Sequence, residues 1–495
     1  MSRLACALFI ATCVVSTWAY AGTASTADNQ AGDDIINRPA ELRLGLEQIT
    51  LPGDEAMGLL GTSYLIQVAS GFYLGPAAYG AISGDRGGFF TAGGELAWRK
   101  NLAPKLRMEA GVYGGGGGGG GTSSVGGGLM IRPHVDLLWD FGSYYAGISA
   151  SNVRFPNGSI DSNQFGLVLS ADSDFSYYSP KLIGQQVEVH GRSGAGFDRV
   201  LITAGIYHEK SGAASASRNI GYAGARMEQF YTPSLYRGIE VSGAVSGGAA
   251  GYAEFLGTLG AETPVWDDRL AVGARFAIGM GGGGAVPVGG GGLIKLGAYA
   301  TADLSRYTHF SLEGGYADAP SGDFRATYGS ADLVWDLDHP YSSARKGTVT
   351  GNEWMFGTEH YSGAAHLDGG KSDLDAIAII LNRYLTDSLY LTGQAHSAYS
   401  GNAGAYSVGL VGAGYRTIFL HGLSAGVELL LGAAGGGSVD TNGGAVVQPT
   451  VYLGMNLTDS VFLRLGAGRV KSFKGALDSN IAELSVGFAF GTASR

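Results

Sequence analysis

The feature that most constrains this chain is a strict two-residue alternation of apolar and polar side chains within short segments. The clearest case lies near the chain's end, where Leu484, Val486, Phe488 and Phe490 alternate with small or charged residues. Side chains of an extended strand point to opposite faces in turn, so this segment separates two different environments. After the first residues no run of about 20 apolar residues occurs, which excludes a membrane-spanning helix. A closed β-sheet can still cross a bilayer, because closure pairs every backbone polar group.

Composition points away from helices and from nucleic acid. Of the 495 residues, 86 are glycine, and each glycine inside a helix costs about 1 kcal/mol. Only 13 residues are proline and no Gly-X-Y period occurs, so collagen is excluded as well. The net charge is −10 and no cluster of Lys and Arg interleaves with aromatic residues. We therefore expect no nucleic-acid partner.

The N-terminal segment predicts export from the cytoplasm. Residues 1–21 combine a basic start at Arg3, an apolar stretch and a small-residue cleavage pattern, as in a secretory signal peptide. Both cysteines, Cys6 and Cys13, fall inside this segment, so the processed chain should contain no disulfide and no thiolate metal site. Residues 22–40 are polar and acidic, which favours a flexible periplasmic segment.

The body of the chain reads as an internal repeat. Three glycine-rich tips recur, at 114–121 with 126–128, at 281–284 with 289–292, and at 435–437 with 443–444. Each tip is flanked by the same order of alternating segments and short turns, and each repeat yields about eight strands. The repeats are expected at about 41–171, 199–337 and 354–490, within a barrel region of 41–491. Residues 172–198 and 338–353 are expected to be periplasmic inserts.

The closing strand, with its apolar row ending in Phe488 and Phe490, resembles the C-terminal strand of Gram-negative outer-membrane β-barrel proteins. The resemblance implies an all-β, antiparallel, transmembrane barrel in the cell outer membrane, with membrane lipid and the barrel-assembly machinery as partners. We predict one barrel of about 24 strands built from three eight-strand repeats. Three linked eight-stranded barrels are the alternative. The absence of a linker rich in proline or serine favours the single barrel.

Alternation also predicts which polar side chains face the barrel interior, because they fall opposite the apolar rows. They form a charged pore lining, a surface on which a plug docks, or a set of charges paired across strands. The predicted lumen-facing residues are Glu95, Arg107, Glu109, His134, Asp136, Glu240, Arg275, Glu313, Glu428 and Arg464.

The glycine tips are expected at the outer rim, since a run without side chains has nothing to bury in lipid. They are either close-packing surfaces for another backbone or a polysaccharide, or simple flexible loops. The recurrence of the tips in all three repeats supports the packing hypothesis. The rim positions are Gly114, Gly118, Gly121, Gly281, Gly284, Gly290, Gly435 and Gly437.

No catalytic, cofactor or metal site is predicted. His134 and Asp136 could act as a base and its orienting carboxylate, but no nucleophile can be assigned to them. His360 and His366 would lie about 20 Å apart on a strand, too far for one metal ion.

The pattern as a whole favours a channel or exporter with a wide polar lumen, and about 24 strands would admit a polymer such as an exopolysaccharide. A non-conducting surface or assembly protein, binding a fibre or barrel through its glycine rims, is the second hypothesis. An outer-membrane hydrolase is the third, with a non-enzyme expected.

Overall fold

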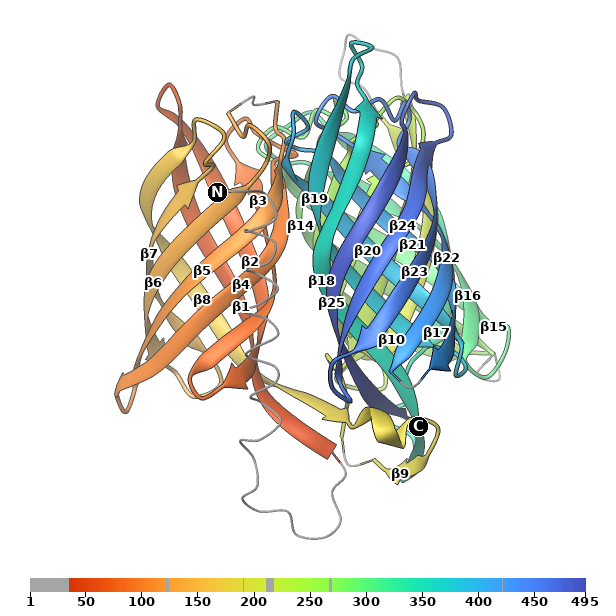
Figure 1. The fold of residues 1–495 in the computed structure, drawn as a ribbon. Helices are drawn as coiled ribbons and strands as arrows, with labels where there is room; N and C mark the ends of the chain where they lie inside the picture. Colours follow the sequence, from red (N-terminus) through yellow and green to blue (C-terminus); the bar gives the residue numbers. More distant parts are fainter. Residues whose placement is uncertain (1–34, 122–123, 190, 211–217, 267–268, 421) are drawn as a thin grey trace.

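The computed structural model describes residues 35–495 except 122–123, 190, 211–217, 267–268 and 421. The predicted signal peptide lies outside the described residues. The chain forms antiparallel β-barrels, which confirms that part of the prediction (Figure 1). Across the described part of the chain, no helix has the length and apolar character needed to cross a membrane.

The strands fall into three groups along the chain. Barrel 1 consists of β1 (Ile35–Leu51), β2 (Glu55–Ala69), β3 (Phe72–Ser83), β4 (Phe90–Ala103), β5 (Leu106–Gly118), β6 (Met130–Asp140), β7 (Tyr145–Arg154) and β8 (Asp161–Tyr178). Barrel 2 consists of β10 (Arg199–Glu209), β11 (Arg218–Phe230), β12 (Leu235–Ala244), β13 (Ala253–Val265), β14 (Leu270–Gly282), β15 (Gly292–Asp303), β16 (Thr308–Asp318) and β17 (Arg325–Asp336). Barrel 3 consists of β18 (Lys346–Ala365), β19 (Lys371–Tyr384), β20 (Leu389–Ser400), β21 (Ser407–Leu420), β22 (Leu423–Gly435), β23 (Ala445–Asn456), β24 (Val461–Ser472) and β25 (Asp478–Ser494).

Each barrel closes on itself. β1 pairs with β8 from Ile35 opposite Tyr178 to Glu47 opposite Gly166. β10 pairs with β17 in the same way, and β18 pairs with β25. The expected single barrel of about 24 strands is therefore wrong, and the pairing corresponds to the alternative of three linked eight-stranded barrels. Turn chemistry fixes which strands are neighbours along the chain, but it does not fix where a sheet closes.

Closure also changes three boundaries. Residues 172–178, expected in a periplasmic insert, extend β8, and residues 35–40, expected in a flexible segment, extend β1 to pair with it. Residues 346–353 belong to β18 rather than to a second insert. The remaining connection between barrels 1 and 2 carries a 3-10 turn, η1 (Pro180–Leu182), and the short strand β9 (Gln186–Glu188), which pairs with β18.

The two ends of the molecule differ. At one end lie the connections between barrels and the C-terminus, and we call it the linker end (bottom of Figure 1). At the other end lie the loops rich in glycine, and we call it the glycine end. The strand-to-strand turns at the linker end have two to four residues, whereas the loops at the glycine end have five or more, except for the three-residue turn 52–54 between β1 and β2. In outer-membrane barrels the short turns face the periplasm.

The barrels have the opposite polarity to a soluble protein, with apolar side chains on the outside and polar ones within. In β23, the outward side chains of Val451 and Leu453 are 58 % and 59 % exposed, while Tyr452 between them is buried. The same alternation runs along the other strands, with charged residues among the buried set. An apolar outer surface around a polar interior is the arrangement of a membrane-spanning β-barrel.

Candidate functional site: the space between the barrels

The interior of barrel 2 is filled by one network of ion pairs. Arg275 contacts Glu240 at 2.5 Å and Glu313 at 2.8 Å. Lys295 contacts the same Glu240 at 2.6 Å and also Glu254 at 2.9 Å, and Tyr207 donates a hydrogen bond to Glu254. All of these side chains are buried. The three predicted lumen-facing residues of this repeat, Glu240, Arg275 and Glu313, are thus brought together, and they pair with one another and with Lys295 rather than line open water.

Barrel 1 holds a similar network around Arg43. Arg43 pairs with Glu95 at 2.5 Å and with Asp136. His134 lies between these carboxylates, with Nε2 at 3.3 Å from Glu95 and Nδ1 at 3.2 Å from Asp136. Arg107, another predicted residue, pairs with Glu41 at 2.6 Å on the same interior.

In barrel 3 the two predicted residues bind each other directly. Arg464 donates both guanidinium hydrogen bonds to Glu428, at 2.7 and 2.6 Å, and a further one to Glu483 at 3.1 Å. Tyr390 also donates to Glu428 at 2.8 Å. All ten predicted lumen-facing residues lie buried inside barrels. Sequence reasoning left out their partners Arg43, Lys295 and Glu483, although Arg43 and Glu483 stand in the same alternating rows.

A wide polar lumen is therefore absent from the described barrels, and the expectation of one is wrong. An eight-stranded barrel is only wide enough for side chains to fill it. Toward the glycine end, buried apolar side chains such as Phe89, Val125 and Phe155 in barrel 1 form a cluster above the charges. Barrels 2 and 3 contain equivalent clusters. Charges and apolar plugs together close each barrel to the passage of a polymer.

One group inside barrel 1 has the composition of a metal site. Ligand atoms of Glu95, Glu109 and His134 lie within 4.8 Å of one another. Arg43 stands among them, with its Nη1 at 2.5 Å from Glu95 and 3.6 Å from Glu109, and supplies the positive charge the carboxylates need. The arrangement fits an ion-pair hub better than a metal centre. That the protein needs no metal stays a prediction.

Glycines hold the barrels against one another in a closed ring. The third strand of each barrel contacts the fifth strand of the next, in the pairs β3 with β14, β12 with β22, and β20 with β5. At each contact a glycine-containing loop of one barrel meets the glycine tip of its neighbour. A head-to-tail contact repeated three times closes into a ring.

Backbone approaches at these glycine contacts leave no room for a side chain. A Cβ on Gly87 of barrel 1 would lie 2.5 Å from the carbonyl oxygen of Gly289 in barrel 2. A Cβ on Gly435 of barrel 3 would overlap Gly251 of barrel 2, and one on Gly404 would overlap barrel 1. The amide of Gly87 also donates a hydrogen bond to the carbonyl of Gly289 at 2.8 Å. Small residues allow such close backbone packing where burial in lipid gives no driving force.

Two of the predicted rim positions, Gly290 and Gly435, meet a neighbouring barrel. Four of them face atoms of their own barrel: Gly118, Gly281, Gly284 and Gly437. Gly114 and Gly121 face open space. The contacting residues Gly87, Gly251 and Gly404 were missed, because only the tips were predicted to form the rim. Each of these glycines lies in a loop two strands before a tip. Their only sequence signal is the recurrence of short glycine-containing loops at that point of each repeat.

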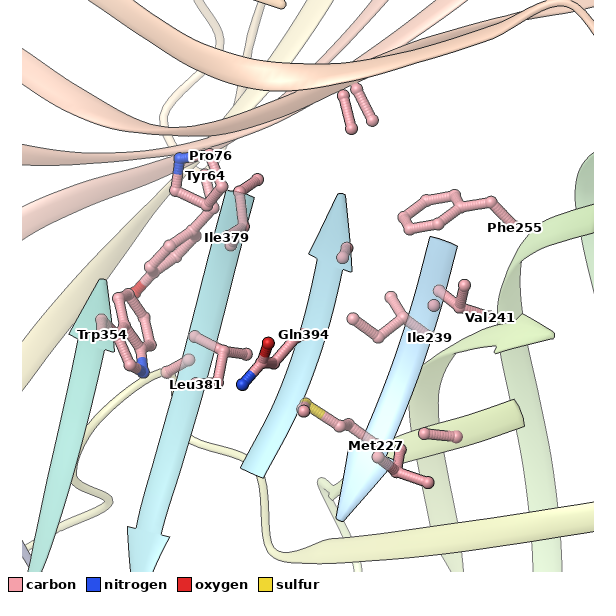
Figure 2. A pocket seen from close by; sticks show the side chains of 18 of the residues that line it. Tyr64, Pro76, Met227, Ile239, Val241, Phe255, Trp354, Ile379, Leu381 and Gln394 are labelled. Carbon is pink, nitrogen blue, oxygen red and sulfur yellow. The ribbon is translucent and has the colours of Figure 1, made fainter. Parts of the chain in front are cut away.

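The ring of barrels surrounds an apolar cavity of about 2110 Å³, which is partly open to its surroundings. Its walls are the outer faces of all three barrels, and side chains from each of them project into it (Figure 2). The residues labelled in the view that face it include Tyr64 and Pro76 from barrel 1, Val241 and Phe255 from barrel 2, and Trp354 and Ile379 from barrel 3. Ligand pockets usually occupy about 300–1,000 Å³, so this space can hold a large molecule.

Aromatic side chains join barrels 1 and 3 beside the cavity. Phe175 of β8 lies 5.0 Å from Trp354 of β18 and 5.2 Å from Phe490 of β25, measured between ring centres. Phe490 is nearly fully buried. The apolar row of the closing strand thus ends against a neighbouring barrel instead of against lipid.

Polar groups gather where the cavity meets the linker end. Arg192 donates to Asp198 at 2.8 and 3.1 Å, and Arg495 pairs with Asp338 at 2.9 Å. Burial raises the pKa of the Asp198 carboxyl, and hydrogen bonds from Arg192 and the Phe230 amide oppose that shift. All four of these charged residues line the cavity, so its two ends differ in chemistry.

No family model and no curated protein sequence matches this chain. Solved structures with overlapping strands include three proteins of Pseudomonas aeruginosa. OccK8 (OprE) has 10 % sequence identity and a TM-score of 0.23, over 94 % of this chain and 100 % of its own. OccK11 (OpdR) has 11 % identity and a TM-score of 0.23, over 92 % of this chain and 96 % of its own. The siderophore receptor PirA has 8 % identity and a TM-score of 0.27, over 93 % of this chain and 81 % of its own. At such TM-scores the overlaps carry no weight for this protein's function.

The protein's own geometry gives its class. Closed antiparallel barrels, apolar outside and charged inside, with short turns at one end and longer loops at the other, are the pattern of outer-membrane β-barrels. The chain is therefore an outer-membrane β-barrel protein located in the outer membrane.

Proposed function

We propose that this protein binds an apolar or amphiphilic molecule in the cavity between its barrels and moves that molecule within or across the outer membrane. The observation that carries the proposal is the contrast between filled and open space. The barrel interiors are occupied by ion pairs, whereas the large open volume lies between the barrels and is walled by apolar side chains. Apolar walls with few polar groups are typical of ligand sites.

A polymer exporter has less support than this carrier function. A polysaccharide or an unfolded chain needs hydrogen-bonding partners along its path, and an apolar wall offers none. The glycine tips also favour the carrier over an assembly protein, because at each contact between barrels the tip packs against a neighbouring barrel of the same chain. We further propose that the protein is not an enzyme and is inserted by the barrel-assembly machinery. The best catalytic candidate, His134, is held inside a closed barrel by Glu95 and Asp136.

Filling the cavity tests the proposal. Ala395 lies on β20 with its side chain facing the cavity, and Ala395→Trp would place an indole there. Ala150 on β7 is likewise exposed on an outer face, but it does not line the cavity, so Ala150→Trp is the matched control. Binding of a fluorescent long-chain fatty acid to purified protein is the measurement. We expect saturable binding by the wild type and the control and a loss of about tenfold or more in Ala395→Trp, since bulk cannot be added to an occupied space without cost.

Planar-bilayer recording gives the complementary test. Barrels closed by buried ion pairs should show no stable ohmic conductance, with or without residues 22–34. A large conductance together with fatty-acid binding unaffected by Ala395→Trp would overturn the carrier proposal and favour a pore.

A further inference from the structure

We infer that the molecule held between the barrels is a phospholipid, with its anionic phosphate against Arg237 and Arg383 and its acyl chains in the apolar part of the cavity. The inference rests on the proposed function and names the ligand of that same site. Its basis is a pair of cavity-lining cations that have no carboxylate partner among the described residues, at one end of a largely apolar space.

Arg383 is the first of the two cations. It lies near the end of β19, lines the cavity, and is largely withdrawn from solvent. Its guanidinium donates to the hydroxyls of Ser494 at 3.0 Å and Thr492 at 3.1 Å and to the carbonyl of Leu337 at 3.3 Å. These partners are neutral, and no carboxylate of the described residues lies within ion-pair distance of it. Asp338, which pairs with Arg495, acts on Arg383 only from beyond that distance. A cation solvated only by neutral groups retains its attraction for an anion.

Arg237 is the second cation and comes from another barrel. It stands near the start of β12 with its side chain on the outer face, lining the cavity. Its Nε donates to the side-chain oxygen of Gln229 at 2.8 Å. Within the described part of the chain it too has no ion pair. Barrels 2 and 3 therefore each present one cation with neutral partners to the same cavity.

The acidic groups at this end are already engaged. Asp198 pairs with Arg192 and Asp338 pairs with Arg495. Asp336 pairs with Arg199 at 2.9 Å and also lies 2.9 Å from His309 Nε2. Asp172 of β8 also lines the cavity, where it lies 4.0 Å from Arg107 and accepts a hydrogen bond from Tyr145. Among the arginines that line the cavity, Arg237 and Arg383 are thus the two of the described residues without an ion pair, so their positive charge is available to an anion. A phosphate group, which accepts hydrogen bonds from guanidinium groups in a fixed geometry, complements that charge.

The cavity has the polarity of a phospholipid along its length. Away from the linker end its walls carry side chains such as Ile239, Val241, Phe255 and Ile379. With the short turns facing the periplasm, the two arginines lie at the depth of the inner-leaflet head groups. The charged group and the chains of a phospholipid thus meet matching surfaces, whereas an uncharged apolar molecule would leave both cations without a counter-ion.

The test compares two lipids that differ only in the phosphate-containing head group. Purified full-length protein is equilibrated with phosphatidylglycerol or with diacylglycerol of the same acyl chains, and bound lipid is counted by native mass spectrometry. Wild type should prefer phosphatidylglycerol by about tenfold or more, because hydrogen bonds to charged groups are among the strongest. The double variant Arg237→Gln/Arg383→Gln should lose the preference while it still binds diacylglycerol. Arg306→Gln removes an exposed cation from a linker-end turn outside the cavity and should behave as wild type.

The outcomes separate the two levels of the proposal. Equal binding of both lipids by wild type overturns the phosphate site and leaves the apolar carrier standing. Binding of neither lipid overturns both. A preference that survives in the double variant also overturns the site. Because Arg383 holds β25 residues and its loss can unfold barrel 3, Arg237→Gln alone and Arg383→Lys are measured beside it. The first should weaken the preference and the second should keep it, while an effect in the opposite sense contradicts the assignment.

Discussion

The inside of each barrel and the space between the barrels are built on opposite principles. Inside barrel 2, Arg275 and Lys295 share Glu240 within a packed interior. Between the barrels, glycines bring backbones together at one end and apolar side chains surround an open volume below them. The interior charges fill each barrel, so the space available to a large ligand lies between the barrels. In a single barrel of about 24 strands, by contrast, the open volume would lie inside the barrel.

Alternation in the sequence located the polar interior well. Glu428 and Arg464 were placed on one side of their strands by neighbours such as Leu429 and Leu465, and they pair in the structure. Alternation is a local signal, so it carries no information about closure. The pairing of Ile35 with Tyr178, which ends barrel 1, joins residues far apart in the chain.

Alternation could not locate the candidate site either. Val241 faces the cavity and Leu167 of β8 faces outward without lining it, yet both are apolar residues in outward rows. The membrane lipid and an apolar cavity select the same side chains, because both are apolar environments. The recurring glycines gave a hint of close packing, but that the partner is the next barrel follows only from the three-dimensional arrangement.

Breaking an interior network should have the largest effect on stability. Arg275→Met leaves Glu240 and Glu313 without their main cation and should destabilise the protein by about 3–5 kcal/mol, the usual cost of breaking a buried pair. Arg325→Met is the control, because its partner Asp318 lies 3.2 Å away at an exposed site and such pairs contribute about 0–1 kcal/mol. Urea unfolding followed by the heat-modifiable gel band measures both. Equal effects would mean that the interiors are hydrated rather than packed.

Disturbing the contacts between barrels should have an intermediate effect and leave each barrel intact. Gly87→Val, Gly404→Val and Gly435→Val each insert a side chain at a different contact, at positions without left-handed backbone. We expect about 1–3 kcal/mol for each, the usual cost of overpacking, and greater separation of the barrels at the glycine end. Distances between spin labels on neighbouring barrels report the separation.

Gly257→Val is the control for those substitutions, since Gly257 lies on the outer face of β13 away from the cavity and a Cβ there meets only the carbonyl oxygen of Ile278 at 3.8 Å. Unchanged distances between the barrels in Gly87→Val, Gly404→Val and Gly435→Val would show that glycine packing does not hold the ring together.

The smallest effect is expected at the exposed connection between barrels 1 and 2. Lys181 of η1 lies 2.7 Å from Asp459 in a turn of barrel 3, and both side chains are mostly exposed. Lys181→Ala should change the free energy of unfolding by less than about 1 kcal/mol, and added salt should abolish the difference. A larger change that salt does not affect would assign the connection a structural role like that of the interior pairs.

Disulfide trapping across the closing strands tests the three-barrel arrangement most directly. Leu46 of β1 and Leu167 of β8 are paired opposite each other on the outer face of barrel 1. With Cys6 and Cys13 replaced by alanine, Leu46→Cys/Leu167→Cys should oxidise to an intramolecular crosslink seen as a faster band on an unreduced gel. Leu46→Cys/Leu484→Cys should not crosslink, because Leu484 belongs to barrel 3. A crosslink in the second pair and none in the first would mean that β1 closes against β25 in one large barrel, which would contradict the account.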